Sequence, residues 1–245
     1  MTIAVIIPAL NEEQALPATL AQVGRLGFDE LIVVDGGSTD RTRELVNALG
    51  VRPEALSSSA SASPTLHASR FTLLTSPPGR ASQMNAGAAV TQSDVLIFLH
   101  ADTHLPDNAR QAIESALADP AYVGGRFDVR FERDRGWAWI IARLISLRSR
   151  LSGIATGDQA IFVRRSTFDQ LDGFADLPLM EDVDFTRRLK RIGRTAALRA
   201  CVTTSFRRWD RCGPVRTICL MWTLRFLYWL GIHPVRLHHW YRAIR

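Results

Sequence analysis

Residues Val95–Asp102 read VLIFLHAD, a five-residue apolar run that ends in a histidine, an alanine and an aspartate. An unbroken apolar run is typical of a strand covered on both faces, as parallel strands are. In such sheets, ligands bind beyond the carboxyl ends of the strands. The stretch therefore predicts a buried strand with functional residues at its tip.

Two earlier apolar runs end in the same way. Ile3–Ile7 (IAVII) is followed by Pro8–Glu12 (PALNE), and Leu31–Val34 (LIVV) is followed by Asp35–Ser38 (DGGS). The carboxyl ends of parallel strands meet at one edge of a sheet. We therefore expect three polar residues to lie along that edge: Asn11, Asp35 and Asp102.

Helical and strand patterns alternate around these runs. Pro17 suits the first turn of a helix that stops at Gly27, and Ser38 suits the N-cap of a helix through Leu49. The serine-rich segment Ser57–Pro64 predicts a mobile surface loop. Further strands are expected at Phe71–Thr75 and Phe127–Phe131, and further helices at Arg80–Val90, Ala109–Leu117 and Trp137–Leu151. This alternation predicts an α/β fold with a mostly parallel central sheet flanked by helices.

The composition suits a single domain over residues 1–245. The chain is 47% hydrophobic and 22% charged, and it is long enough for one α/β core. We expect no secretory signal, because the only apolar run near Met1 is the five-residue run assigned to a strand. Cys201, Cys212 and Cys219 lack the close pairing of zinc or redox sites. We therefore expect reduced thiols and a cytoplasmic protein.

The net charge of +6 is concentrated near the C-terminus. Residues 206–245 hold eight arginines and one aspartate, so this tail carries +7 and the preceding residues about −1. No nucleic-acid-binding module is visible, and we expect no nucleic-acid partner. Anionic lipid head groups or sugar diphosphates suit an arginine- and tryptophan-rich tail better.

Four motifs follow one another along the chain: Pro8–Glu13 (PALNEE), Val34–Thr42 (VDGGSTDRT), Leu99–Asp102 (LHAD) and Met180–Asp184 (MEDVD). Their order and spacing resemble glycosyltransferase family 2, a large family of inverting sugar transferases with the GT-A fold. The resemblance runs from Ile3 to about Arg194. It implies transfer of a sugar from a nucleoside-diphosphate sugar to an acceptor hydroxyl. We expect a nucleotide-sugar-binding half over 1–105, an acceptor-side half over 106–205 and a basic, aromatic, helical tail over 206–245.

Two further segments, Gly79–Ala88 (GRASQMNAGA) and Gly157–Arg165 (GDQAIFVRR), resemble a compact bacterial subgroup associated with arsenosugar biosynthesis. The segments do not identify the acceptor. We assign five residues to the acceptor or diphosphate side: Gly125, Asp158, Gln159, Arg208 and Trp209.

The resemblance places the nucleobase of the donor at Asp35, whose carboxylate can accept a hydrogen bond from a base imide. The alternative is that Asp35 and Asp40 only cap the next helix. Arg80 and Asn85, with the amides of a helix start, can approach the donor phosphates, although a lone arginine is more often a surface residue. The expected donor-binding residues are Pro8, Asn11, Glu12, Asp35, Gly36, Arg80, Asn85 and Asp102.

A divalent cation is expected because a diphosphate leaving group gains negative charge as the sugar bond breaks. Family members usually carry a carboxylate, one residue and a second carboxylate here, whereas this chain has His100–His104 (HADTH). Candidate ligands are Asp102, His100 and His104. The carboxylate suits Mg²⁺ and imidazole shifts the preference toward Mn²⁺. For each histidine, an ordinary hydrogen-bonded role is the alternative.

The family motif makes Asp182 the candidate general base, with Glu181 beside it. A carboxylate in a pocket can have its pKa raised toward the working range and take a proton from an acceptor hydroxyl. The alternative is that these acids only stabilise the first turn of a helix. Asp184 is expected to pair with Arg188, four residues on.

The tail contains Phe206–Trp209 (FRRW) and the apolar segment Ile218–Ile232. This segment is too short, and with Arg225 too charged, to predict a membrane span. The Arg-Trp pair resembles one near the donor diphosphate of processive relatives, but Ser205 replaces their glutamine, so we infer no polymer synthesis. The apolar segment has three alternatives: a core helix, an interfacial helix or a homodimer contact. In a peripheral membrane contact, four arginines would reach the lipid head groups: Arg207, Arg208, Arg211 and Arg216. Four aromatic rings would lie at the membrane boundary: Trp222, Phe226, Tyr228 and Trp229.

Two functions are compatible with these motifs. The first is a metal-assisted inverting glycosyltransferase, which the retained Asp102 and Asp182 favour. The second is a nucleotide-sugar-binding protein of the same fold whose turnover is weakened because His100 replaces an acid.

Overall fold

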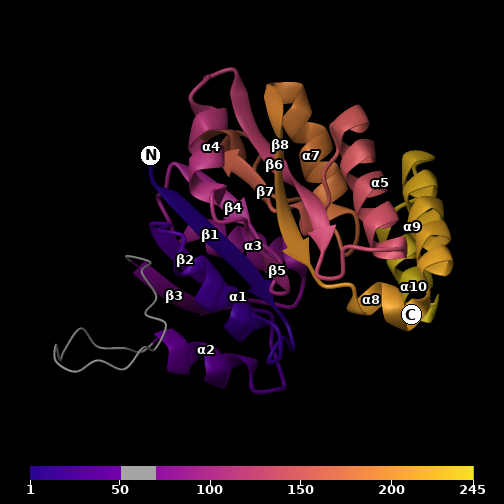
Figure 1. Cartoon of the computed structure of the whole chain (residues 1–245), viewed down its shortest axis with the longest axis horizontal. Coiled ribbons are helices and arrows are strands. Elements are labelled where there is room, and N and C mark those ends of the chain that lie inside the picture. Colours follow the sequence, from indigo (N-terminus) through magenta and orange to yellow (C-terminus); the bar gives the residue numbers. More distant parts are fainter. Residues whose placement is uncertain (51–69, 245) are drawn as a thin grey trace.

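The computed structural model describes residues 1–50 and 70–244. These residues form one sheet in the strand order β3-β2-β1-β4-β7-β6-β8-β5, flanked by helices as predicted (Figure 1). The serine-rich segment Ser57–Pro64 lies outside the described residues.

Four neighbouring strands of the first half are parallel: β1 (Ile3–Ala9), β2 (Glu30–Asp35), β3 (Arg70–Thr75) and β4 (Val95–Phe98). Strand β1 pairs with β2 on one side and with β4 on the other, and β2 pairs with β3. The carboxyl ends of these strands therefore meet at one edge, as the three apolar runs predicted.

The remaining strands extend the sheet with mixed directions. Strand β7 (Ile161–Arg164) is antiparallel to β4 and to β6 (Tyr122–Phe131), and β8 (Arg194–Thr204) is parallel to β6. The short strand β5 (Thr103–His104) pairs antiparallel with β8. It connects the segment after Asp102 to the far half of the sheet.

The helices lie close to their predicted positions. The helix expected at Leu16 ends at Val23 rather than at Gly27, because Gly24 forms its C-cap. The bounds are α1 (Leu16–Val23), α2 (Thr42–Gly50), α3 (Arg80–Ala89), α4 (Ala109–Leu117), α5 (Trp137–Ser152), the 3₁₀ helix η1 (Gly157–Gln159), α6 (Arg165–Gln170), α7 (Glu181–Ile192), α8 (Arg207–Cys212), α9 (Pro214–Trp229) and α10 (Pro234–Ile244).

Burial on both faces explains why the first strand forms. Every residue of β1 is buried, and alternate side chains enter two different cores. Val5 and Ile7 pack in the core that contains α1 and α4, whereas Ile6 packs in the core that contains α3 and α7. Helices therefore cover both faces of the sheet, which explains the unbroken apolar runs.

The start of α2 differs from the prediction. The helix begins at Thr42, not at Ser38, because the Asp40 carboxylate accepts hydrogen bonds from Thr42 N at 3.0 Å and from Glu13 N at 3.2 Å. The Ser38 hydroxyl instead accepts a hydrogen bond from Asn11 N at 2.9 Å. Ser38 therefore ties two loops together and does not cap the helix.

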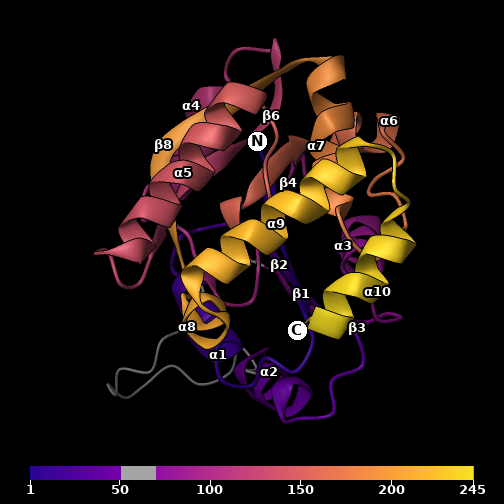
Figure 2. The same ribbon diagram turned by 90° about the vertical axis from the view of Figure 1, so that its right-hand side faces the viewer.

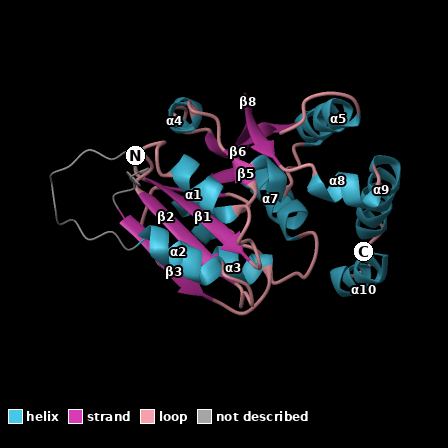
Figure 3. Cartoon of the chain, turned by 60° about the horizontal axis from the view of Figure 1, so that its bottom comes forward, coloured by secondary structure: helices cyan, strands magenta, loops and turns pink. Residues whose placement is uncertain are grey.

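The basic tail is helical, as predicted. Helices α9 and α10 lie at one end of the molecule, away from β1, β2 and β3 (Figures 1 and 3). Leu224 of α9 and Leu237 of α10 are buried together with Met180, which precedes α7. One face of the apolar tail segment is thus packed against the domain. In the part of the chain that the structure describes, no helix is both long and apolar enough to cross a membrane.

Gly87 allows α3 to approach the sheet closely. A Cβ atom at Gly87 would lie 2.5 Å from Ile6 Cγ2 and 3.1 Å from Val34 Cγ2. We expect Gly87→Val to lower the free energy of unfolding by about 1–3 kcal/mol through overpacking, as measured by urea denaturation. Ala89→Val, which introduces valine on the exposed face of α3, is the matched control. Equal losses in the two variants would contradict this account.

Candidate active site

Two loops at the carboxyl edge of the sheet are held together by hydrogen bonds. Asn11 Oδ1, in the loop after β1, accepts a hydrogen bond from Thr39 N at 2.8 Å. Glu12 N donates to Thr42 Oγ1 at 2.8 Å. Asn11 adopts a left-handed φ of 55°, which asparagine tolerates better than most residues. Two of the three predicted edge residues, Asn11 and Asp35, therefore stand on a linked pair of loops.

Asp35 ends β2 with a carboxylate that is fully buried. Its Oδ2 accepts hydrogen bonds from Gly37 N at 3.1 Å and from Ser38 N at 3.1 Å, and Arg43 Nε lies 3.9 Å away. These contacts organise the turn after the strand. Binding of a nucleobase by Asp35 stays a prediction.

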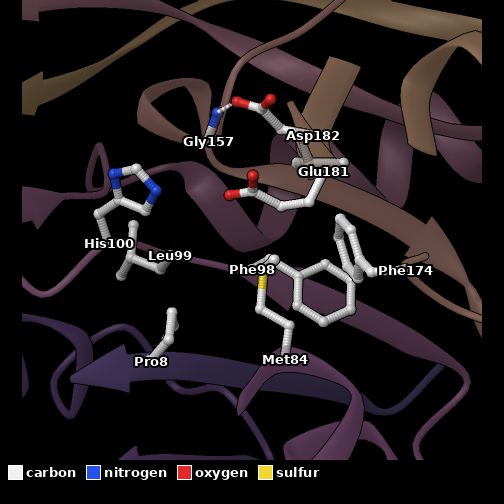
Figure 4. Close-up of a pocket in the computed structure, with 10 residues that line it drawn as sticks. Pro8, Met84, Phe98, Leu99, His100, Gly157, Phe174, Glu181 and Asp182 are labelled. Atoms are coloured by element: carbon white, nitrogen blue, oxygen red, sulfur yellow. Dashed lines mark hydrogen bonds between the residues drawn. The ribbon is translucent and has the colours of Figure 1, made fainter. Parts of the chain in front are cut away.

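A pocket opens between the tip of β4 and the first turn of α7 (Figure 4). Its polar residues come from three segments: His100, Gly157, Glu181 and Asp182. The predicted donor-side residue Pro8 also lines it. The other lining residues were not predicted, because in the sequence they are indistinguishable from core residues: Met84, Phe98, Leu99, Ile161 and Phe174.

Backbone amides hold the Asp182 carboxylate in place. Gly157 N donates to Asp182 Oδ2 at 2.8 Å, and Val183 N donates to Asp182 Oδ1 at 2.7 Å. A Cβ atom on Gly157 would collide with the His100 imidazole, so glycine allows the two segments to approach. Asp158 and Gln159 of the same GDQ motif were predicted site residues, whereas Gly157 was not.

Glu181 and His100 face the same space and have strongly shifted pKa values (Figure 4). Burial and the neighbouring charge of Asp182 raise the pKa of Glu181 to about 7, although Arg80 Nη1 lies 4.0 Å from Glu181 Oε1. Desolvation and the charge of Arg80 lower the pKa of His100 to about 4. The imidazole is therefore neutral at physiological pH, and Glu181 exchanges a proton near neutrality. Such perturbed groups cluster at functional sites.

Arg207 connects the tail to the strand tips. Its Nη2 lies 3.6 Å from Asp102 Oδ2 and 3.7 Å from Glu12 Oε2. Burial and the charge of Asp102 raise the pKa of Glu12, and Arg207 opposes that shift. Contact of Arg207 with lipid head groups stays a prediction. Its ion pairs place it at the carboxyl edge, to which α8 follows β8. The FRRW motif contains Arg207, but only Arg208 and Trp209 of that motif were predicted to lie at the diphosphate side of the site.

The predicted metal ligands do not gather in one place. His100 faces the pocket of Glu181 and Asp182, whereas His104 lies in β5, opposite Thr203 of β8. Within residues 1–50 and 70–244, no three histidine, cysteine, aspartate or glutamate side chains come close enough to hold a metal ion. Asp102, His100 and His104 therefore do not form a metal centre by themselves. Asp102 instead shares Arg207 with Glu12.

Several predicted donor-side residues have packing contacts. Gly36 lies against Gln83, whose Nε2 donates to the Ala9 carbonyl at 2.8 Å. Asn85 Nδ2 donates to the Phe174 carbonyl at 2.8 Å, and Asn85 Oδ1 accepts from Phe174 N at 2.9 Å. The amide of Asn85 thus fixes the segment that forms one wall of the pocket. Donor contacts of Gly36 and Asn85 stay predictions.

Two of the predicted acceptor-side residues lie beside the pocket: Asp158 and Gln159 follow Gly157 in η1, and Asp158 interacts electrostatically with His100. Gly125 and Gln159 are buried in β6 and in η1. Asp158 Oδ1 is buried and has no hydrogen-bond partner among the described residues. Trp209 stacks on Phe206, with ring centroids 6.1 Å apart. The side chain of Arg208 lies outside the described part of the structure.

The chain is similar to known proteins in both sequence and fold. The family model described as Glycosyl transferase family 2 matches residues 4–172. Over 125 residues, the chain is 32% identical to the 4,4'-diaponeurosporenoate glycosyltransferase of Staphylococcus haemolyticus, covering 50% of this chain and 30% of that protein. Over 169 residues, it is 30% identical to the undecaprenyl-phosphate 4-deoxy-4-formamido-L-arabinose transferase of Pseudomonas paraeruginosa, covering 66% of this chain and 46% of that protein. The chain spans less than half the length of either relative.

A solved structure with a similar fold is a mannosyltransferase from Pyrobaculum calidifontis in complex with GDP-Man and Mn²⁺. Its TM-score is 0.60 at 21% sequence identity, and the match covers 82% of this chain and 56% of that chain. The likeness confirms the predicted GT-A architecture.

The pKa of Glu181 makes stability depend on pH. With a pKa of about 7 in the folded chain and an ordinary value of 4.5, Glu181 loses its proton first in the unfolded chain. Its protonation therefore supports folding fully below about pH 4.5, and this support is lost as pH rises to about 7. We expect Glu181→Gln to raise the free energy of unfolding by about 1–3 kcal/mol at about pH 8, and not at about pH 4.

Urea denaturation across this pH range measures the difference. Glu132→Gln, at an exposed position, is the matched control. If both variants follow the parent at every pH, Glu181 does not have a raised pKa.

Proposed function

Because the chain belongs to glycosyltransferase family 2, we propose that it transfers a sugar, with inversion, from a nucleoside-diphosphate sugar to an acceptor hydroxyl. One observation carries the proposal: the carboxylates of Glu181 and Asp182 share a pocket with the tip of β4. The GDP-Man in the similar mannosyltransferase structure supports a nucleotide-sugar donor.

Asp182 acts as the general base in this proposal. The acceptor oxygen forms a bond to the anomeric carbon as the bond from that carbon to the diphosphate breaks, and the hydroxyl proton passes to the Asp182 carboxylate. The amides of Gly157 and Val183 keep this carboxylate oriented. Since Glu181 is protonated in much of the population near neutral pH, it adds little charge repulsion beside Asp182.

A divalent cation, Mn²⁺ or Mg²⁺, supplies positive charge to the leaving diphosphate when it is bound. Asp102 and Glu12 fit such an ion, because Mg²⁺ is commonly held by one or two carboxylates together with substrate phosphates. The Mn²⁺ in the similar structure supports this assignment. Arg207, which contacts both carboxylates, adds positive charge beside the same phosphates.

We also propose a subgroup, a division into two halves and a location for the chain. The motifs GRASQMNAGA and GDQAIFVRR support the arsenosugar-associated subgroup. We further propose a donor half over 1–105, an acceptor half over 106–205 and a cytoplasmic location. The acceptor itself is left open.

A nucleotide-sugar-binding protein with weakened turnover is the alternative. It is favoured by His100, a neutral group where family members usually carry an acid. Donor hydrolysis measured with Mn²⁺ separates the two functions. Hydrolysis supports the enzyme, whereas donor binding without hydrolysis supports the alternative.

Replacing the proposed base tests the mechanism. We expect Asp182→Asn to reduce transfer or donor hydrolysis by about a hundredfold or more, because the proton has no acceptor. The affinity for nucleoside diphosphates, measured by calorimetry, stays close to that of the parent. Asp176→Asn, an exposed carboxylate before α7, is the matched control. Full activity in Asp182→Asn would remove this residue from the role of base.

Asp102→Ala tests the cation site through binding alone. We expect the Mn²⁺-dependent affinity for a nucleoside diphosphate to fall at least about tenfold, because a ligating carboxylate is lost. Without metal, the affinity is unchanged or higher, since Arg207 is released toward the phosphates. Asp107→Ala, exposed in the same segment, is the control. The same metal dependence in Asp102→Ala and the parent would exclude Asp102 as a ligand.

A further inference from the structure

Helices α5, α9 and α10 share one end of the molecule, which Figure 2 views face on. Large apolar side chains are exposed there, including Trp222 at 63%, Trp229 at 75% and Leu151 at 80%. Elsewhere in the described part of the chain, the large apolar side chains that are exposed are Met1, Leu10 and Val90. Exposed apolar area is therefore concentrated on these helices and on the turn that joins α9 to α10.

Both α5 and α9 carry an apolar stripe on the side that faces away from the domain. On α5, Leu144, Leu147 and Leu151 follow the spacing of one helix face, opposite the buried residues that pack on the sheet. On α9, Trp222 and Trp229 are two turns apart and exposed, whereas Leu224 is buried. In each helix, the inner apolar face packs on the domain. Within the described residues, no apolar surface covers the outer face.

The charges on these helices have one sign. The sequences of α5, α9 and α10 contain seven arginines and neither aspartate nor glutamate, and Arg143, Arg216 and Arg236 are exposed. Two other arginines of α5 face the domain: Arg148 is largely buried, and Arg150 Nη2 lies 2.7 Å from Asp128 Oδ2. Arginine places its apolar stem along a surface and its guanidinium among polar groups. An anionic surface that is apolar beneath its charges matches this combination.

We propose that the outer faces of α5, α9 and α10 form a docking surface for an anionic lipid bilayer. The surface differs from the tail contact expected from sequence, because it includes α5 and excludes Arg207, which faces Asp102. A second copy of this chain fits less well, since two such faces would oppose like charges.

The helices of the docking surface contact the segment that carries Glu181 and Asp182. Leu224 of α9 packs against Met180, the residue before Glu181. Arg148 of α5 interacts electrostatically with Arg225 of α9 and with Asp182, and burial together with Arg225 lowers the pKa of Arg148 to about 10. If the proposed transfer reaction is correct, docking places its general base beside the bilayer and favours an acceptor that resides there.

Vesicle sedimentation of the full chain tests the surface. We expect the protein to sediment with vesicles of phosphatidylcholine and phosphatidylglycerol but not with phosphatidylcholine alone, and salt to weaken the association by screening. Two double variants, Trp222→Ser/Trp229→Ser and Leu144→Ser/Leu147→Ser, each lower the partition coefficient at least about tenfold. Arg143→Gln and Arg236→Gln each lower it about fivefold.

Val90→Ser removes an exposed apolar side chain outside the surface and is the matched control. Binding of nucleoside diphosphates with Mn²⁺, measured on the same proteins, stays at the parental level, so failure of docking and failure of the proposed function are distinguishable. The proposal is overturned if the parent does not bind anionic vesicles, or if either double variant binds as well as the parent. Sedimentation equilibrium that shows a dimer dissociated by these variants would assign the face to a second copy.

Discussion

Complete burial of β1 is the constraint on which the rest of the structure depends. A strand whose residues are all buried needs helices on both faces and parallel neighbours whose connections bring those helices. Polar side chains would be costly inside this sandwich, so they collect where the strands end. There they link the loops after β1 and β2, through Asn11 and Ser38 among others. The position of the site is thus a consequence of how the core excludes polar groups.

At that edge, two pairs of carboxylates are each accompanied by an arginine from a distant element. Glu12 and Asp102 share Arg207 of α8, and Glu181 with Asp182 lies near Arg80 of α3. In each pair, burial and the second carboxylate raise the pKa of the glutamate. The arginines reduce this repulsion without removing it, and neutral His100 adds no positive charge. In the proposed reaction, a metal-bound diphosphate would bring the additional positive charge that these carboxylates lack.

The sequence was sufficient for features that depend on local pattern. Apolar runs predicted the strands and their common edge, and the spacing of Asp184 and Arg188 predicted an ion pair found at 2.7 Å. The sequence did not predict which of two capping residues starts a helix, or which side chains from distant segments meet. Ser38 and Asp40 are both good N-caps, and a hydrogen bond from Asn11 in another loop decides between them. The contacts of Gly157 and Arg207 depend on how the second half of the chain returns to the strand tips, which no local pattern encodes.

Helix α9 joins the tail to the start of α7, where the carboxylates of Glu181 and Asp182 lie. Met180 adopts a left-handed φ of 69° at the start of α7, a conformation that costs free energy for a residue with a side chain. Its side chain is buried with Leu224 and Leu237, so packing by the tail helices offsets that cost. The same packing fixes the first turn of α7, which carries Glu181 and Asp182. A partner that binds the outer face of α9 therefore binds a helix whose inner face positions the first turn of α7.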